Sequence, residues 1–332
     1  MIPRVSIYIP VRNRAQLLAE TLRAIQAQTF GDWECRVVDD ASTDDTFEVI
    51  QSFQREDARI QGTRLSQPGG DAIASNTALG LLHGRYAARM DSDDLPLPTW
   101  LEAAMDFARH FNGAGFGCQA EWFGSVSDFI PGKPKETDPQ RWQAWSLFNF
   151  EINHSGLIFH RAVQQRTGVL YRPITLNNDW DFVHRLSQHG AFANLPSVQV
   201  HIRRHGGNTT RADRVIEDRD SLSVALRRRL LVERLGVHPS DEDMLLHCTA
   251  HPAPYWRFSD QAYVWLRRDD YPQRLNIWLQ RLLAANRASG CPYSPAILQQ
   301  VLLDELLPAA TANWCNLPDR PPPQFRMSWL PG

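Results

Sequence analysis

The chain has 332 residues, of which 43% are hydrophobic and 22% are charged, a composition that excludes a disordered or fibrous protein. Its formal net charge is −2, so no overall field indicates a nucleic-acid or anionic-membrane partner. The five cysteines form no Cys-x-x-Cys pair, and no apolar run approaches the ~20 residues that span a bilayer. We therefore expect no transmembrane segment and a cytoplasmic protein, free or peripheral at the inner face of the membrane.

The first half of the chain alternates between strand and helix patterns. Val5, Ile7 and Ile9 alternate with polar residues, which predicts a strand that Pro10 ends. Further strands are predicted near residues 34–38, 59–65 and 86–90, with helices near 14–28, 46–53 and 72–83. Alternation with short connections predicts a mainly parallel sheet flanked by helices.

Local signals suggest where three of the helices begin or face the core. Asn13, with Gln16 three residues later, predicts a capping box for the first helix. Asn177 or Asn178 can cap a later helix. In the third helix, the residues expected to face the core are Ile73, Thr77 and Leu81.

Acidic residues follow two of the predicted strands. Asp39-Asp40 ends the second strand, and residues 91–94 read Asp-Ser-Asp-Asp after the fourth. In extended backbone Asp91 and Asp93 point the same way, and carboxylate oxygens suit Mg²⁺ or Mn²⁺. The alternative is a solvated turn that caps the next helix.

Three segments together resemble a known family. Residues 5–13, 37–44 and 89–94 resemble, in order and spacing, the motif series of family 2 glycosyltransferases. The likeness covers roughly residues 3–210 and implies a GT-A type, Rossmann-like fold with a mixed, mainly parallel sheet flanked by helices. Two positions depart from the family pattern: Ser75 stands where an Arg usually precedes Asn76, and Asn178 replaces a usual acid.

The resemblance implies a nucleotide-diphospho-sugar donor and inversion at the transferred carbon. A UDP-sugar carrying a hexosyl or N-acetylhexosaminyl group is the expected donor. Asp40 would accept a hydrogen bond from the base, since uracil, thymine and guanine all present a ring N–H. The other donor-side residues implied are Pro10, Val11, Arg12, Arg14, Asn76, Asp91 and Ser92.

The same resemblance implies a metal site on the Asp91-x-Asp93 motif. Asp93 is the expected direct ligand for Mn²⁺ or Mg²⁺. His205 matches a family position that meets the metal or the diphosphate, and His201 matches it less well. An imidazole ligand favours manganese over magnesium.

On the acceptor side, the resemblance places the general base at Asp179. Trp180 follows it as the family pattern requires, and His154 faces the acceptor. Asp179 would take the proton of the acceptor hydroxyl, whereas Asp181 is a weaker candidate. The structural alternative for Asp179 is a carboxylate that stabilises a helix N-terminus.

Two further functions and a second domain stay open. A nucleotidyltransferase would show a Gly-rich loop after the first strand, which residues 10–14 lack. A non-catalytic nucleotide-sugar or protein-binding module is the other alternative. We expect a catalytic domain over 1–212 and a mostly helical region over 213–332, which could form a homo-oligomer. The acceptor could be a saccharide, a lipid-linked sugar or a peptide.

Overall fold

The computed structural model describes residues 2–124, 130–174, 177–205, 216–250 and 268–315, in two compact units. The first unit is Met1–Pro139 with Glu151–His205, and the second is Gln140–Phe150 with Gly206–Gly332. The catalytic domain expected over residues 1–212 includes residues 140–150. They belong instead to the second unit, because Ala144, Leu147 and Phe148 are buried in its core.

The first unit is built around a nine-stranded mixed sheet, as expected. Its strands are β1 (Val5–Val11), β2 (Trp33–Asp39), β3 (Ile60–Arg64), β4 (Tyr86–Arg89), β5 (Leu95–Pro96), β6 (Gly115–Gly124), β7 (Ile130–Pro131), β8 (Ile158–His160) and β9 (Phe192–Arg204). The order is β3-β2-β1-β4-β8-β6-β9-β5, with β7 paired to β6. Strands β3, β2, β1 and β4 are mutually parallel, so their carboxyl ends lie at one edge.

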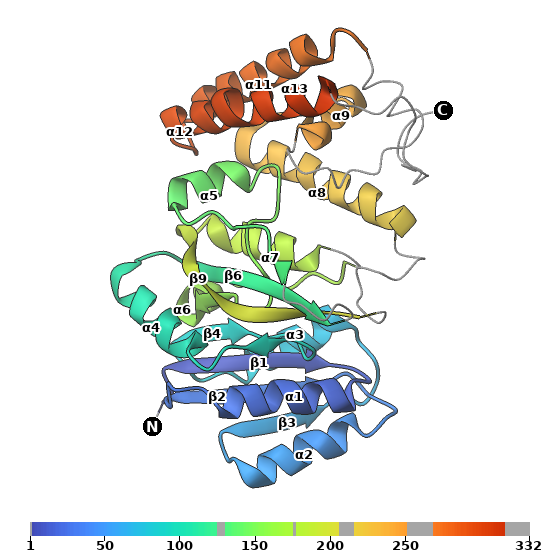
Figure 1. Cartoon of the computed structure of the whole chain (residues 1–332), viewed down its shortest axis with the longest axis vertical. Helices are drawn as coiled ribbons and strands as arrows, with labels where there is room; N and C mark the ends of the chain where they lie inside the picture. Colours follow the sequence, from blue (N-terminus) through green and yellow to red (C-terminus); the bar gives the residue numbers. More distant parts are fainter. Residues whose placement is uncertain (1, 125–129, 175–176, 206–215, 251–267, 316–332) are drawn as a thin grey trace. The chain divides into compact units, whose positions relative to one another are not determined.

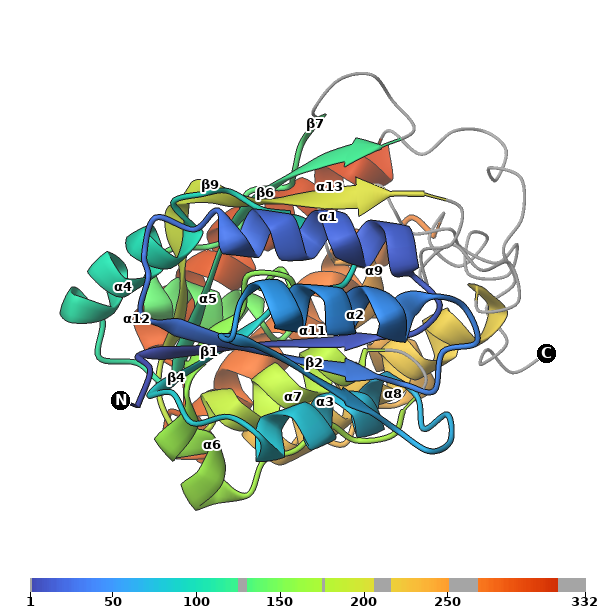
Figure 2. The ribbon, with the colours of Figure 1, turned by 90° about the horizontal axis from the view of Figure 1, so that it is seen from below.

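Helices cover both faces of this sheet. They are α1 (Ala15–Gln26), α2 (Thr46–Glu56), α3 (Asp71–Gly80), α4 (Trp100–His110), α6 (Arg161–Thr167) and α7 (Asn178–Ser187). Figure 2 shows α1 and α2 on one face and α3, α6 and α7 on the other. This arrangement confirms the GT-A type architecture, which Figure 1 shows in the colours of the sequence.

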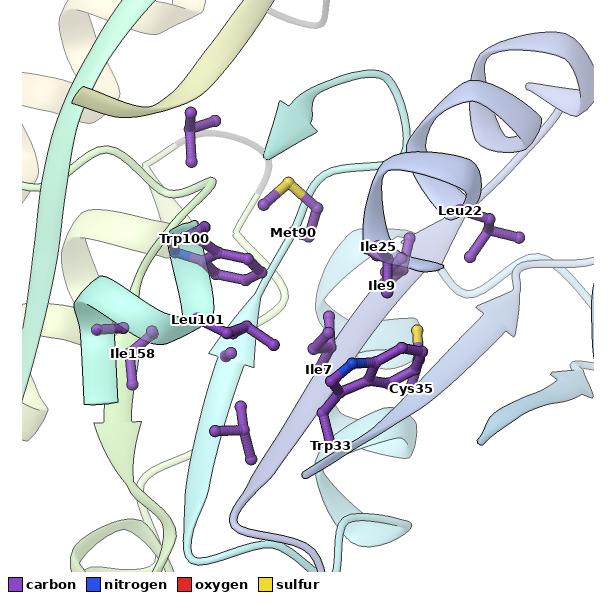
Figure 3. Packing of buried hydrophobic residues seen from close by; sticks show 14 of the residues in the cluster. Ile7, Ile9, Leu22, Ile25, Trp33, Cys35, Met90, Trp100, Leu101 and Ile158 are labelled. Atoms are coloured by element: carbon purple, nitrogen blue, oxygen red, sulfur yellow. The ribbon is translucent and has the colours of Figure 1, made fainter. Parts of the chain in front are cut away.

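The main core of the first unit lies between the sheet and the helices α1, α2 and α4. Figure 3 shows Ile7 and Ile9 of β1, Leu22 and Ile25 of α1 and Trp100 of α4 among its side chains. All seven residues of β1 are buried, including the polar ones that alternate with the apolar positions. The strand is therefore central, with both faces covered, rather than half exposed.

Three sequence-based predictions about helix starts and faces are wrong. Asn13 does not cap α1; its φ is 52° and its Oδ1 accepts a hydrogen bond from Thr43 N instead. Neither Asn177 nor Asn178 caps α7 through its side chain. In α3, Ile73 is 47% exposed, because the opposite face, made of Leu79 and the small residues Ala72, Ala74, Ser75 and Ala78, points inward.

The second unit is helical, as expected for its carboxyl-terminal part. It contains α5 (Pro139–Trp145), α8 (Ile216–Leu235), α9 (Asp241–Thr249), α11 (Tyr271–Ala288), α12 (Pro295–Gln299), a π-helical stretch η3 (Gln300–Leu306) and α13 (Leu307–Cys315). His247 is buried in its core, where it stacks on Phe148 and its Nε2 lies 3.0 Å from Leu147 O. Burial lowers the pKa of His247 to about 3, so this imidazole is neutral.

The arginines at positions 227–229 form a basic run in α8, which usually lies on a solvated helix face. Arg227 is buried, and its Nε donates to Phe148 O. Residues 206–215 and 316–332 lie outside the described residues. No helix in the described ranges is long and apolar enough to cross a bilayer.

Candidate active site

The acids predicted to converge follow strand ends at one edge of the sheet. Val11 of β1 pairs with Asp39 of β2, and Tyr8 pairs with Arg89, the last residue of β4. Because these strands are parallel, the segments after Val11, Asp39 and Arg89 all leave the sheet at its carboxyl edge. This is where open α/β sheets bind ligands.

Asp93 is held by two basic side chains from distant parts of the sequence. Arg14 Nη1 donates to Asp93 Oδ2 at 2.5 Å, and His205 Nε2 lies 2.8 Å from the same oxygen. Arg14 Nη1 and His205 Nε2 are 3.0 Å apart. The Asp93 side chain is only 11% exposed. The structure thus brings together three residues predicted for the donor and metal side.

The donor set at Asp93 fits part of a divalent-cation site. Asp93 Oδ2 and His205 Nε2 are 2.8 Å apart, close to the ~3 Å between neighbouring ligands of an octahedral ion at about 2.1 Å. Within the described ranges, no group of three or more His, Cys, Asp or Glu residues is arranged to hold a metal. Two protein ligands suffice for an ion that keeps water and phosphate ligands, and such an ion would compete with Arg14 for Asp93.

Arg89, at the end of β4, joins two further acids. Its Nε and Nη2 lie 2.8 Å from Asp91 Oδ1, and Nη2 also donates to Asp71 Oδ1 at 2.8 Å. Nη1 donates to Ser75 Oγ at 2.6 Å. Although burial lowers it, the charges of Asp71 and Asp91 hold the pKa of Arg89 well above its usual value. Arg89 is therefore a permanent, buried positive charge between β4 and α3.

Asp71 connects this arginine to the start of α7. Its second oxygen, Oδ2, accepts a hydrogen bond of 2.9 Å from Asn178 Nδ2, and Asn178 immediately precedes Asp179. Burial raises the pKa of Asp71, but the charge of Arg89 and the hydrogen bonds from Arg89 and Asn178 prevail and lower it to about 2. Asp71 is ionised at neutral pH and accepts from both sides.

Asp179 differs from the other acids of this edge in its partners. Its Oδ1 accepts a hydrogen bond from Trp180 N at 2.8 Å, and no residue of the described ranges is recorded as bonding to its Oδ2. Asp71, Asp91 and Asp93 each contact an arginine within 3 Å. Asp179 is also half-buried, in the first turn of α7. Asp179 thus keeps one carboxylate oxygen that accepts no hydrogen bond within the described residues.

His154 lies between Asp91 and a buried pair of tyrosines. Its Nε2 is 2.9 Å from Tyr171 Oη, which is 2.7 Å from Tyr8 Oη, and its Nδ1 is 3.9 Å from Asp91 Oδ1. Burial and then the charge of Arg89 lower the pKa of His154, so the ring is neutral at pH 7. Burial raises the pKa of Tyr171 well above its usual value, so its hydroxyl stays protonated. A Tyr171 hydroxyl that donates to Nε2 leaves Nδ1–H to face Asp91.

Asp94, the last acid of the motif, points into the unit. Its Oδ1 accepts from Arg203 N at 2.8 Å, its Oδ2 accepts from Ser155 Oγ, and the residue is 4% exposed. Burial and the nearby carboxylates of Asp91 and Asp93 raise the pKa of Asp94 well above its usual value. Asp94 thus ties the motif to β9 rather than presenting a charge to a ligand.

Two residues predicted on the donor side already make backbone contacts. Asp40 accepts hydrogen bonds from Gly69 N and Gly70 N at 2.6 and 2.9 Å, which fixes the loop before α3. Gly70 has a φ of +81°, a conformation that favours glycine. Asn76 pairs with the backbone N–H and C=O of Tyr171, both at 2.8 Å, so both ends of its amide have a structural role.

The remaining predicted residues take varied positions. Pro10 and Val11 are buried at the end of β1, Ser92 is buried, and Arg12 is exposed. Trp180 is 5% exposed. Asp181 is buried and paired with Arg172 and Arg185, and His201 lies 3.3 Å from Glu121 on β6.

Sequence reasoning missed the role of Asp71, Arg89 and Tyr171. Asp71 follows the Pro-Gly-Gly break, and Arg89 stands in a buried strand where a charge needs a partner. A charged residue in an otherwise apolar strand pattern indicates that an acidic partner lies elsewhere in the chain, and Arg89 is such a residue. Tyr171 lies in a segment with no recognisable pattern.

The chain resembles known sequences over about its first half. The model of the family described as Glycosyl transferase family 2 matches residues 6–169. A putative teichuronic acid biosynthesis glycosyltransferase of Bacillus subtilis is 34% identical over 39% of this chain and 52% of its own length. A GalNAc(5)-diNAcBac-PP-undecaprenol beta-1,3-glucosyltransferase of Campylobacter jejuni is 34% identical over 42% and 45%. The chain spans about half the length of these relatives.

Solved structures extend the likeness in fold to nearly the whole chain. Staphylococcus aureus TarS 1–349 in complex with UDP-GlcNAc has a TM-score of 0.61 at 16% identity, covering 96% of this chain and 93% of that one. The mannosyltransferase PcManGT of Pyrobaculum calidifontis, in complex with GDP-Man and Mn²⁺, has a TM-score of 0.54 at 18% identity, covering 95% and 88%. The family model and the order of the motifs agree over residues 6–169, and this part of the chain belongs to glycosyltransferase family 2.

Proposed function

We propose that the chain is an inverting glycosyltransferase that transfers a sugar from a nucleotide-diphospho-sugar to an acceptor hydroxyl. A UDP-sugar is the donor we favour. The observation that carries this proposal is the convergence of Asp91, Asp71 and the start of α7 around Arg89. Asp179, which has no arginine partner among the described residues, directly follows Asn178 in this cluster. The complexes of TarS with UDP-GlcNAc and of PcManGT with GDP-Man support a nucleotide-sugar donor.

The donor would lie over the carboxyl edge of β1, β2 and β4. Asp40 is the proposed contact for the base, because each of its oxygens keeps a lone pair beyond the bond from Gly69 or Gly70. Asp93 and His205 are the proposed ligands of Mn²⁺ or Mg²⁺. When bound, the cation would offset charge that develops on the departing diphosphate. Arg14, displaced from Asp93, would be near enough to contact a phosphate.

On the acceptor side, Asp179 is the proposed general base. Its uncommitted Oδ2 would accept the proton of the attacking hydroxyl, and attack opposite the leaving group inverts the anomeric carbon. His154 would present its Nδ1–H beside Asp91 without adding charge. The acceptor itself, saccharide, lipid-linked sugar or peptide, is left open.

The test is a thermal-shift screen with UDP-GlcNAc and GDP-mannose, each with and without Mn²⁺, followed by a nucleotide-release assay. A bound donor at about 100 times its Kd adds about 2.7 kcal/mol, which raises the melting temperature by about 5–10 °C. Release of nucleoside diphosphate supports the transferase. Release of pyrophosphate would support a nucleotidyltransferase, and binding without release would support a non-catalytic module.

A further inference from the structure

Three residues from separate elements form a continuous polar connection, which we call the Asp71 link. It consists of Asp71 at the start of α3, Arg89 at the end of β4 and Asn178 at the start of α7. Arg89 donates to Asp71 Oδ1 at 2.8 Å, and Asn178 donates to Asp71 Oδ2 at 2.9 Å. Each oxygen of one carboxylate therefore fixes a different element.

The two ends of the Asp71 link are residues of the proposed site. Arg89 also binds Asp91, which follows β4, through two nitrogens at 2.8 Å. Asn178 is covalently joined to Asp179. The path from the acidic motif to the proposed base therefore runs through Asp91, Arg89, Asp71, Asn178 and Asp179. Each non-covalent step along it is a direct hydrogen bond.

The first turn of α7, which carries Asp179, is also held by Asp181, which pairs with Arg172 outside the helix. Asn177 makes no capping hydrogen bond, and its φ of 59° shows that the chain turns sharply just before the helix. Without a cap, the first turn of α7 depends on other contacts for its position. The bond from Asn178 to Asp71 connects this turn with the start of α3.

The link also accounts for the two departures from the family pattern. Ser75, which stands where an arginine was expected, accepts a hydrogen bond of 2.6 Å from Arg89. Asn178, which stands where an acid was expected, faces Asp71. A carboxylate at position 178 would oppose the Asp71 carboxylate at hydrogen-bond distance, whereas an amide donates to it. Ser75 and Asn178 therefore both form a hydrogen bond with a charged neighbour, Arg89 and Asp71 respectively.

We propose that the Asp71 link is a positioning device, which holds Asp179 at a fixed place relative to Asp91 for transfer. Asp71 and Asn178 are positioning residues that act through Asp179. This inference rests on the proposed function for its effect on turnover. A misplacement of about 1 Å at a reacting group can lower a rate about 100-fold.

The test exchanges the two partners. Asp71→Asn removes the charge that pairs with Arg89, although an amide at position 71 can still form a hydrogen bond with Asn178, and in Asn178→Asp two carboxylates face each other. The double variant Asp71→Asn/Asn178→Asp restores a donor opposite an acceptor, with nearly unchanged side-chain volumes. We expect each single variant to lower kcat for UDP release from UDP-GlcNAc with Mn²⁺ by about 10- to 100-fold, with KM for the donor within about threefold. The double variant should recover most of the lost kcat.

A matched control is Asp106→Asn, which breaks the exposed ion pair of Asp106 with Arg109 on α4. It should leave kcat and the melting temperature unchanged. Single variants with wild-type kcat, or a double variant no better than the worse single one, would overturn the proposal. A fall in melting temperature with kcat per folded molecule unchanged would also overturn it, since the link would then only hold the fold together.

The two proposals fail in different ways. Wild-type protein that turns over none of the nucleotide-sugars contradicts the proposed function alone. In that case the melting temperatures of the same four proteins decide whether the link exists, because the exchange should restore stability as well. Additive losses of melting temperature in the double variant would show that Asp71 and Asn178 do not act together.

Discussion

Glu34 is the residue whose charge we expect to contribute most measurably to the stability of the first unit. It lies on β2 with its side chain 12% exposed, and it accepts hydrogen bonds from Ser6 Oγ at 2.5 Å and His83 N at 2.7 Å. Arg36 Nη2 lies 2.7 Å from its other oxygen. Ser6 Oγ in turn accepts from Gly84 N at 2.7 Å, so this cluster fixes the turn that leads into β4.

The expected magnitude follows from the pKa of Glu34. Burial raises this pKa, but the hydrogen bonds from Ser6 and His83 and the charge of Arg36 prevail and lower it to about 2. Relative to an ordinary glutamate at 4.5, the difference corresponds to about 3 kcal/mol of stability at neutral pH. Because the folded-state pKa is lowered, this contribution is present above the unfolded pKa and is lost as the pH falls through about 4 to about 2.

Glu34→Gln removes the charge and keeps the size of the side chain. We expect urea unfolding, followed by tryptophan fluorescence, to give a loss of about 3 kcal/mol at pH 7 that shrinks to about 1 kcal/mol at pH 3. The control is Glu48→Gln, an exposed glutamate on α2, which should change the free energy of unfolding by less than about 0.5 kcal/mol. A loss at pH 7 that is the same at pH 3 would refute the charge as its cause.

Three further outcomes test the site. Asp179→Asn should keep the thermal shift caused by UDP-GlcNAc and lower kcat by about 10²- to 10⁴-fold, whereas wild-type turnover in a release assay would remove Asp179 as the base. Arg14→Gln should tighten Mn²⁺ binding about fivefold by calorimetry, because Arg14 no longer competes for Asp93; weaker binding would count against the cation site. Because the pKa of Asp94 is raised in the folded state, its ionisation lowers the stability of wild type as the pH rises. Asp94→Asn lacks this charge, so its melting temperature should rise relative to that of wild type as the pH increases from 5 to 8. A relative loss over that range would contradict the assignment.

The positions of candidate site residues could be predicted from the sequence where acidic residues follow the end of a strand. Asp91 and Asp93 were predictable because a short buried strand ends in acids, and parallel strands place such ends at one edge. Asp71 was not predictable, since nothing in its spacing tells that α3 starts beside Arg89. The same holds for Asn76, whose amide binds the backbone of Tyr171 across 95 positions of sequence.

Helix faces were harder to predict than strand ends. The stripe that includes Ile73 looked like a core face by hydrophobicity alone, yet close packing of α3 on the sheet selects small side chains such as Ala74 and Ala78. The prediction of helix caps from the sequence failed for a related reason. Asn13 was drawn from its cap position by a longer-range partner, Thr43, which local sequence patterns do not reveal.

The path of the chain between the two units bears on how this protein can be cut. Residues 140–150 leave the first unit and return, so a single cut after His205 would strand Leu147 and Phe148 without the α9 and α11 side chains that bury them. Such a fragment would expose this hydrophobic segment to solvent and would be prone to aggregate. A well-behaved catalytic fragment would also need that excursion replaced by a short polar bridge.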